Sequence, residues 1–142
     1  MSLRFSPIVV TDATTYTVKA YNSGLVHIFP DLTADITVTM PSPAKGLDFT
    51  FWYGGAAADA HDWLFTTGTN TNYFVGGVVH VDEDSADAEA ASVYSDGNSN
   101  SKLTVLTPAA GTWVRMICDG TKWYVNGAVV SASASAAAFA DQ

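Results

Sequence analysis

Three histidines and a single cysteine are the nitrogen and sulfur side chains in this sequence that could form a zinc site. His27, His61 and His80 lie in three separate segments, and Cys118 lies in a fourth. Structural zinc sites bring together about four such ligands, commonly from closely spaced pairs, and this sequence offers no such pair. We therefore expect no metal site and no cofactor. One cysteine excludes a disulfide within the chain, and we expect Cys118 to be a small buried hydrophobe.

An acidic stretch, Asp82–Glu89, offers a second chemical possibility. His80, Asp82 and Asp84 alternate along what is expected to be a strand end, so their side chains could share one face as a cation clamp or an acid–base pair. An EF-hand calcium loop would add a glycine at its sharp turn and a bidentate glutamate, and neither is in place. We prefer the interpretation of a solvated loop and keep calcium binding as the alternative.

A pair of carboxylates for glycoside cleavage is the third possibility. Asp35 and Asp48 are the nearest option, but each lies on the polar side of its own apolar–polar alternation, where an aspartate normally meets solvent. The sequence also has no Gly-x-Ser-x-Gly elbow and no phosphate-binding loop. We predict that the chain is not an enzyme and has no catalytic residues.

The elements that would have to position such residues are strands. Apolar residues recur with a period of two, which is typical of strands with one buried face. The pattern is cleanest at Ile36–Met40, and Pro41 and Pro43 then end the run because proline has no N–H to donate. The pattern predicts strands at 15–19, 25–29, 36–40, 47–53, 62–66, 73–81, 102–107, 112–118 and 122–125, with a short element around Val93 between two surface loops.

Turn residues indicate how these strands connect. We expect the 36–40 and 47–53 segments to form a hairpin. Asp119-Gly120 is the strongest short-range hairpin signal, and Asn126-Gly127 offers a second turn directly after it. The pair Gly76-Gly77 interrupts another predicted strand and indicates a bulge or a close approach of backbones.

These patterns together predict an all-β fold. We expect a single-domain antiparallel β-sandwich or distorted barrel of about eight to ten short strands, with little or no helix. Residues 1–13 are expected to be an N-terminal arm or an edge strand, and residues 14–130 the sandwich or barrel. Residues 131–142 are expected to be a low-complexity C-terminal tail of alanine and serine.

The composition favours assembly. Hydrophobic residues make up 48% of the chain and charged residues only 14%, against about 25% charged residues in an average soluble domain. A chain of this length has too little polar cover for so much apolar surface, so we expect copies to cover one another. The alternative is a monomer in which Ala, Ser and Thr replace charge at the surface.

Charge and hydropathy also exclude some partners. The net charge is −8 and the six Lys and Arg residues are scattered, so we expect no nucleic-acid contact. No apolar run reaches the roughly 18–20 residues of a membrane span, and the start of the chain lacks the features of a signal peptide. We therefore expect no membrane contact and synthesis in the cytoplasm without secretion.

Aromatic residues concentrate on the predicted strands. Where adjacent positions of one strand both carry large rings, as at Trp52 beside Phe51 or at Trp123 beside Tyr124, one face is core and the other needs a separate cover. A neighbouring subunit or a sugar ring would each supply that cover.

Two stretches resemble proteins of tailed-bacteriophage virions. The first looks like the I-x-V-x-L-P, glycine, aromatic hairpin of phage decoration and fibre-associated modules, and consists of Ile36–Pro41, Gly46 and Phe49. The second is similar to the G-x-x-V-x-L-x-x-D-G-x-x-W-x-V-x-G ending of the same proteins, and consists of Gly111–Val114, Cys118–Val125 and Gly127. Loops similar to those of small head decoration proteins occur at Tyr53–Ala56, His61 and Asp96–Ser99, so the resemblance touches most of residues 14–130.

The resemblance implies a capsid decoration (cement) protein of the virion. Such a protein is a homotrimer on the outer capsid surface that binds the major capsid protein and stabilises the shell. It implies trimer contacts from the aromatic strands, which carry Trp52, Trp63, Trp123 and Tyr124. The N-terminal segment, with Arg4, Phe5, Ile8 and Val9, could lie along a capsid subunit as an arm, or the same residues could be the first edge strand.

A second interpretation belongs to another class of protein. Both motifs also occur in tail fibres and spikes, so the chain could be a receptor- or carbohydrate-binding module that uses exposed rings such as Trp52 or Trp63. A hydrolytic spike domain is a third interpretation, and the lack of a convincing carboxylate pair counts against it.

Overall fold

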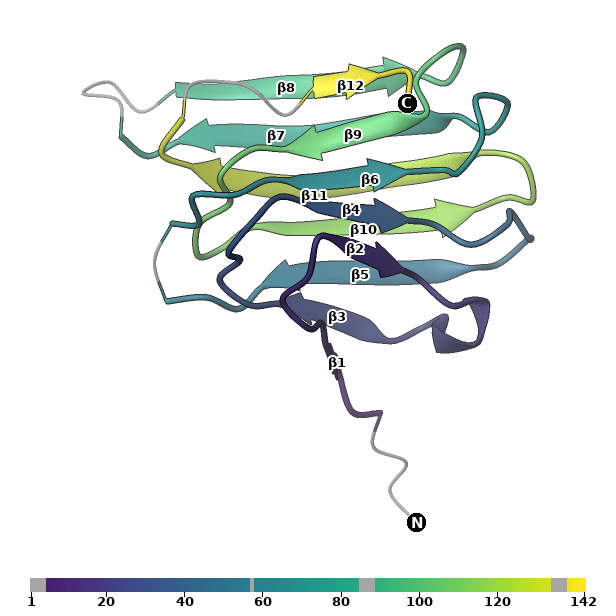
Figure 1. Ribbon diagram of the computed structural model, residues 1–142. Coiled ribbons are helices and arrows are strands. Elements are labelled where there is room, and N and C mark those ends of the chain that lie inside the picture. Colours follow the sequence, from purple (N-terminus) through teal and green to yellow (C-terminus); the bar gives the residue numbers. More distant parts are fainter. Residues whose placement is uncertain (1–4, 57, 85–88, 134–137) are drawn as a thin grey trace.

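Two β-sheets pack face to face in the computed structural model, which describes residues 5–56, 58–84, 89–133 and 138–142 (Figure 1). Within these residues a seven-stranded sheet has the order β1-β3-β5-β10-β11-β7-β8 and a five-stranded sheet the order β12-β9-β6-β4-β2. The seven-stranded sheet contains β1 (Ile8–Val9), β3 (Val26–Phe29), β5 (Asp48–Tyr53), β10 (Trp113–Cys118), β11 (Trp123–Ser131), β7 (Phe74–Asp82) and β8 (Glu89–Asp96). The five-stranded sheet contains β12 (Ala138–Ala140), β9 (Lys102–Val105), β6 (Trp63–Thr66), β4 (Ile36–Thr39) and β2 (Thr15–Thr17). The predicted all-β sandwich is thereby confirmed.

The first six strands alternate between the two sheets along the chain. Strands β1, β3 and β5 lie side by side in one sheet, and β2, β4 and β6 lie side by side in the other (Figure 1). Because the chain crosses to the opposite sheet and returns each time, neighbouring strands of this half run in the same direction. The sheets are therefore mixed, and the expectation of a purely antiparallel sandwich is wrong.

The expected hairpin between segments 36–40 and 47–53 does not form. Ile36–Thr39 is β4 of the five-stranded sheet, whereas Asp48–Tyr53 is β5 of the seven-stranded sheet. The prolines that end β4 begin a crossing between sheets rather than a tight turn within one sheet.

The expected hairpin at Asp119-Gly120 is confirmed. Strands β10 and β11 pair antiparallel, with Cys118 opposite Trp123. The Asp119 carboxylate accepts the backbone N–H groups of Thr121 and Lys122, each at 2.8 Å. Gly120 has a φ of 109°, a left-handed conformation that glycine adopts without strain.

Asn126-Gly127 is not a turn, because both residues lie inside β11. A Cβ atom on Gly127 would collide with the carbonyl oxygen of Trp113 on β10. A Cβ on Gly77 would collide in the same way with the carbonyl oxygen of Val93 on β8, as the sequence predicted for the Gly76-Gly77 pair. These glycines let strand backbones approach closely.

Two segments expected to be irregular also form strands. Strand β8 extends the short element around Val93 to Glu89–Asp96 and pairs with β7. In the expected tail, β12 pairs with β9, and its Phe139 packs against the ring of Phe74 with centroids 6.2 Å apart. The ladder with β9 and the packing of Phe139 together attach this segment to the sandwich.

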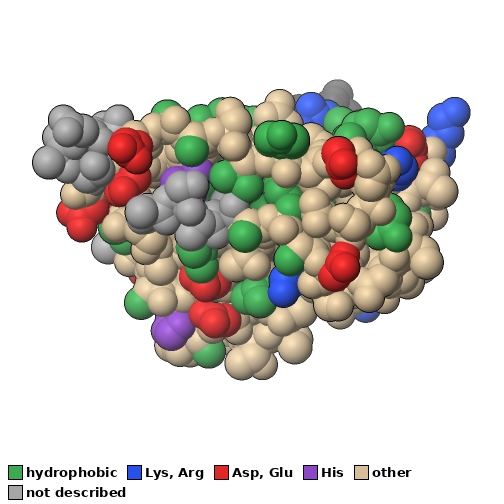
Figure 2. Space-filling model, turned by 90° about the horizontal axis from the view of Figure 1, so that it is seen from above, with side chains coloured by type: hydrophobic (Ala, Val, Ile, Leu, Met, Phe, Trp, Pro, Cys, Tyr) green, Lys and Arg blue, Asp and Glu red, His purple; other side chains and the backbone are tan. Residues whose placement is uncertain are grey.

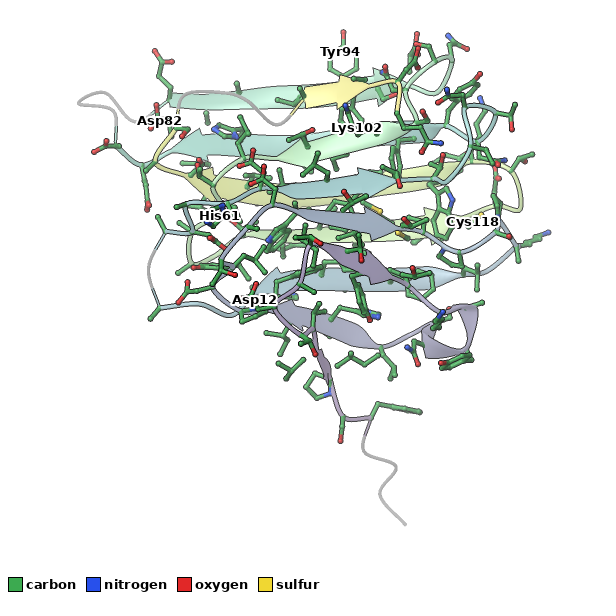
Figure 3. The ribbon with its side chains drawn as sticks, viewed as in Figure 1. Asp12, His61, Asp82, Tyr94, Lys102 and Cys118 are labelled. Carbon is green, nitrogen blue, oxygen red and sulfur yellow. The ribbon has the colours of Figure 1, made fainter. Side chains whose placement is uncertain are left out.

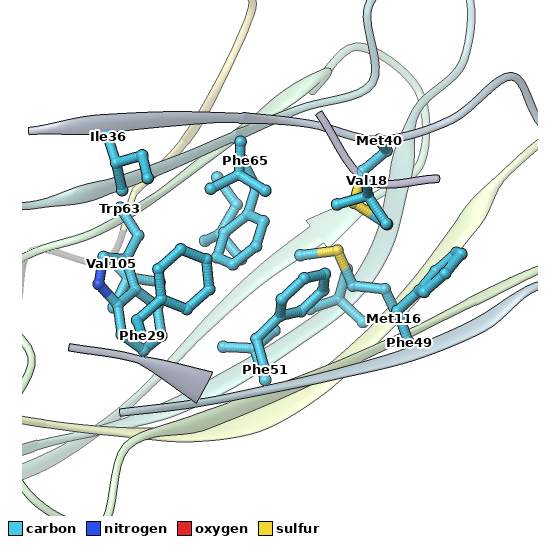
Figure 4. Close-up of a cluster of buried hydrophobic side chains, with 14 of the residues drawn as sticks. Val18, Phe29, Ile36, Met40, Phe49, Phe51, Trp63, Phe65, Val105 and Met116 are labelled. Carbon is cyan, nitrogen blue, oxygen red and sulfur yellow. The ribbon is translucent and has the colours of Figure 1, made fainter. Parts of the chain in front are cut away.

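An aromatic layer joins the two sheets (Figure 4). Phe29 on β3 stacks on Trp63 on β6, with ring centroids 4.5 Å apart and an interplanar angle of 28°. Phe51 on β5 packs against Phe65 on β6, with centroids 4.8 Å apart. All four side chains are fully buried, and burying each contributes about 1.5–3 kcal/mol.

His27 on β3 is buried inside this layer. Its ring packs against Phe51 at a centroid distance of 5.1 Å and against Tyr16 and Phe49 at 5.9 Å each. Burial holds the pKa of His27 below its ordinary value of 6.5, because a charged ring would lose its hydration, and nearby backbone groups of Leu25 and Thr50 offset only part of this effect.

This burial predicts a loss of stability in mild acid. Below about pH 6.5 the unfolded chain gains a proton on His27 that the folded chain does not bind, so the free energy of unfolding falls as the pH is lowered. His27→Leu should show a smaller fall between about pH 7 and pH 5, measured by urea denaturation. The half-exposed His61→Leu is the control and should retain the fall; equal pH profiles for the parent and His27→Leu would contradict the assignment.

Candidate interaction surface

The outer face of the five-stranded sheet is polar. Residues paired across neighbouring strands project to the same side of a sheet, so the register defines rows of side chains on each face. One outward row is formed by Thr15, Thr37, Leu64 and Thr104, and the next by Thr17, Thr39, Thr66 and Lys102. Hydroxyl groups dominate this face, which suits contact with water.

The outer face of the seven-stranded sheet is apolar instead. An outward row crosses six of its described strands and consists of Val9, Ile28, Trp52, Trp113, Ala128 and Val79. Val9 is 70% exposed, Val79 46% and Trp52 41%. We call this row, together with the exposed Ile117 and Tyr124 on the same face, the apolar face. Monomeric proteins rarely expose contiguous apolar surface of this kind without a partner.

Two tryptophans form the centre of the apolar face. Trp52 on β5 lies opposite Trp113 on β10, and their rings stack with centroids 6.2 Å apart and an interplanar angle of 21°. At the β1 edge of the sheet a groove of about 510 Å³ opens beside Trp52. Its lining residues are Phe5, Pro7, Gly24, Leu25, Val26, Ile28, Trp52, Tyr53 and Gly54.

The charges on this face cancel. The outward positions of β3, β5, β10 and β11, all within the described residues, carry two groups that are charged at neutral pH, Asp48 and Arg115. The guanidinium donates to both carboxylate oxygens, from Nη2 at 2.6 Å and from Nε at 3.0 Å, and these bonds raise the pKa of Arg115. The centre of the apolar face is therefore neutral in a chain whose net charge is −8.

Of the interface residues predicted from the sequence, some lie on or beside this face. Trp52 and Tyr124 belong to it, as does Val9 at its β1 edge. Phe5 is exposed at the groove, and Ile8 is half-buried on β1. Arg4 lies outside the described residues.

Trp63 and Trp123 were predicted as interface residues and are wrong in that role. Both side chains are fully buried between the sheets. Trp63 stacks on Phe29, and Trp123 packs beside Phe49 with ring centroids 6.1 Å apart. A ring enclosed by its own chain meets neither a neighbouring subunit nor a sugar.

Sequence reasoning missed several members of the apolar face: Ile28, Val79, Trp113 and Ile117. Strand β10 has large apolar residues on both sides, with Trp113 and Ile117 facing out and Val114 and Met116 facing in. Alternation alone does not tell which side is buried. The pairing of Trp113 with Trp52 shows that Trp113 lies on the outward side of β10. That pairing joins strands distant in the sequence, so the sequence pattern alone does not reveal it.

The histidines and the cysteine considered for metal chemistry do not gather into one site among the described residues. His61 and Cys118 lie toward opposite ends of the sandwich (Figure 3). His80 is buried, and its Nε2 lies 3.0 Å from the carbonyl oxygen of Ser133. No group of three or more His, Cys, Asp or Glu side chains that could hold a metal ion occurs among the described residues. The expected acidic loop falls partly outside them, because residues 85–88 are not described.

The candidate carboxylate pair also separates. Asp48 pairs with Arg115 on the apolar face. Asp35 accepts the backbone N–H of Asp62 at 2.9 Å and lies 3.6 Å from Nδ1 of His61, next to the five-stranded sheet. On the face seen from the β8 and β12 edge, acidic side chains lie at several separate places (Figure 2).

Comparison with known proteins identifies no relative: no family model and no curated protein matches the chain. No helix in the described residues is long and apolar enough to cross a membrane.

The two kinds of tryptophan should differ in their effect on folding. Trp63→Ala removes a ring from the aromatic layer and should lower the free energy of unfolding by about 3–5 kcal/mol. Trp52→Ala removes a half-exposed ring and should change it by less than about 1 kcal/mol. Chemical denaturation of dilute protein, where association does not contribute, measures both; equal losses would show that Trp52 is part of the core.

Proposed function

We propose that this chain is a non-enzymatic structural protein of a phage virion, a homotrimeric decoration protein that binds the outer capsid surface and stabilises the shell. The observation that carries the proposal is the contrast between the two outer faces of one sandwich. One face is lined with threonine, whereas the other presents an apolar row from Val9 to Val79. A protein that worked alone would gain nothing from exposing that row to water.

A second copy of the chain is the occupant that the charges favour. Copies with a net charge of −8 repel each other over most of their surfaces. Around Trp52 and Trp113 the ion pair between Asp48 and Arg115 leaves no net charge, so repulsion is weakest where apolar area is greatest. Depletion of net charge with enrichment of aromatic residues is the composition of interface cores.

The capsid as the second partner is supported by the sequence resemblance. The motif from Gly111 to Gly127 corresponds to the β10–β11 hairpin. Its turn is at Asp119-Gly120, and Tyr124 on β11 is exposed on the apolar face. A protein that binds only the assembled shell stabilises it by mass action, through about RT ln(1 + [L]/Kd) at every site. This mechanism needs shape and contact area rather than catalytic groups.

The oligomer is tested by placing charge on one face at a time. The parent chain should sediment at three times the 15.0 kDa of one chain. Trp52→Glu combined with Val79→Glu adds two buried negative charges to the proposed contact and should yield monomers that remain folded. Thr37→Glu combined with Thr104→Glu adds the same charge to the opposite face and should leave the trimer intact. A parent chain that stays monomeric at high concentration would contradict the proposed function.

Binding to the shell is tested with isolated phage heads freed of their decoration proteins. The parent protein should bind at a fixed number of sites and raise the temperature at which the heads break open. The monomeric Trp52→Glu, Val79→Glu variant should bind more weakly because it loses the avidity of three linked contacts. Co-sedimentation and a thermal melt of the heads measure both effects, and absence of binding by the parent would count against a decoration role.

Carbohydrate binding by a fibre module remains the second candidate, and one observation favours it. The stacked rings of Trp52 and Trp113 form an exposed aromatic platform, on which the apolar face of a sugar ring could pack. A glycan screen distinguishes the two functions. Specific sugar binding that is lost in Trp52→Ala would support an adhesion module in place of a decoration protein.

A further inference from the structure

The N-terminal segment leaves the sheet before the groove is filled. Strand β1 pairs with β3 at two positions, Ile8 with His27 and Val9 with Ile28. Pro7 has no N–H to extend this ladder, and residues 5–7 continue away from the body of the sandwich (Figure 1). Val10 is buried and attaches the segment to the core on the C-terminal side of Pro7, whereas Phe5 on the other side is largely exposed.

The groove beside this segment has the character of a site for an aromatic side chain. The nine described residues that line it include no charged group, and its volume of about 510 Å³ lies in the range of ligand-binding pockets. The lining includes Val26 and Ile28 of β3, the preceding Leu25, and Trp52 of β5. Phe5 also lines the groove but stays 77% exposed, so it does not fill the groove of its own chain.

We propose that this groove receives Phe5 of a neighbouring copy, so that the N-terminal segments are exchanged around the oligomer. The inference rests on the proposed function, because it names the contact by which the copies hold one another. Exchange of an identical segment between copies is a low-cost route to oligomers.

Two features of the groove select a second copy as its occupant. First, the described residues of its lining are uncharged in a chain of net charge −8, so another copy meets little repulsion from them. Second, the groove is continuous with the apolar face, because Ile28 and Trp52 belong to both. A single association would therefore cover the apolar face and fill the groove.

The reach of the segment fixes the geometry. Three extended residues span at most about 10 Å, so Phe5 reaches a neighbour only if that neighbour lies directly against the β1 edge. If each copy inserts Phe5 into the next one, the contacts are head-to-tail and close into a ring. A threefold ring satisfies all three grooves and all three Phe5 side chains.

Disulfide trapping tests the exchange. In a Cys118→Ala background, which removes the native thiol, Phe5→Cys is combined with Leu25→Cys so that each exchanged segment can link to the next copy. Mild oxidation should produce covalent dimers and trimers on a denaturing gel, and reduction should return them to single chains. Phe5→Cys combined with Thr37→Cys, on the opposite outer face, is the matched control and should not link.

The outcomes separate the two proposals when the mass of the unoxidised parent is measured in parallel. A trimeric parent whose cysteines link only within one chain, or do not link, overturns the exchange and leaves the decoration function standing. A parent that is monomeric at every concentration overturns both.

Discussion

Packing of aromatic rings between the two sheets is the constraint on which the rest of this structure depends. Phe29 against Trp63 and Phe51 against Phe65 join the sheets, and successive residues of a strand point to opposite sides. Once Phe51 and its neighbours Phe49 and Tyr53 face inward, Trp52 has to face outward. The exposed ring at the centre of the apolar face is thus a consequence of how the core is filled.

The winding of the chain explains why the two outer faces differ. Strands β2, β4 and β6 come from one series of crossings and carry threonine on their outward sides, whereas β1, β3 and β5 come from the other and carry Val9, Ile28 and Trp52. Strand β10 then adds Trp113 beside Trp52. One series therefore supplies a face suited to water and the other a face suited to protein.

The same winding leaves an open edge. Strand β1 begins the stack and pairs over two residues, so the sheet ends there with a short strand and a groove. Exposed strand edges are surfaces on which other chains readily add. If copies of this acidic chain associate as proposed, the groove and the neutral part of the apolar face lie next to each other where the contact would form.

The sequence by itself determined the positions of most strands, the hairpin at Asp119-Gly120 and the close approach at Gly77, because alternation, turn chemistry and glycine geometry act between residues near in the chain. It also indicated that one face of the strand with Phe51 and Trp52, and of the strand with Trp123 and Tyr124, needs a cover outside the core, but not which face.

Only the tertiary structure decided which sheet each strand joins and which tryptophans are enclosed. Segments 36–40 and 47–53 have the same alternating pattern whether they form a hairpin or lie in separate sheets, and packing placed them apart. Trp63 and Trp123 are buried while Trp52 lies half-exposed. Yet all four tryptophans of the chain, Trp113 included, occur on strands of similar composition. The period of two defines two faces of a strand, and the face that becomes core is chosen by partners distant in the sequence.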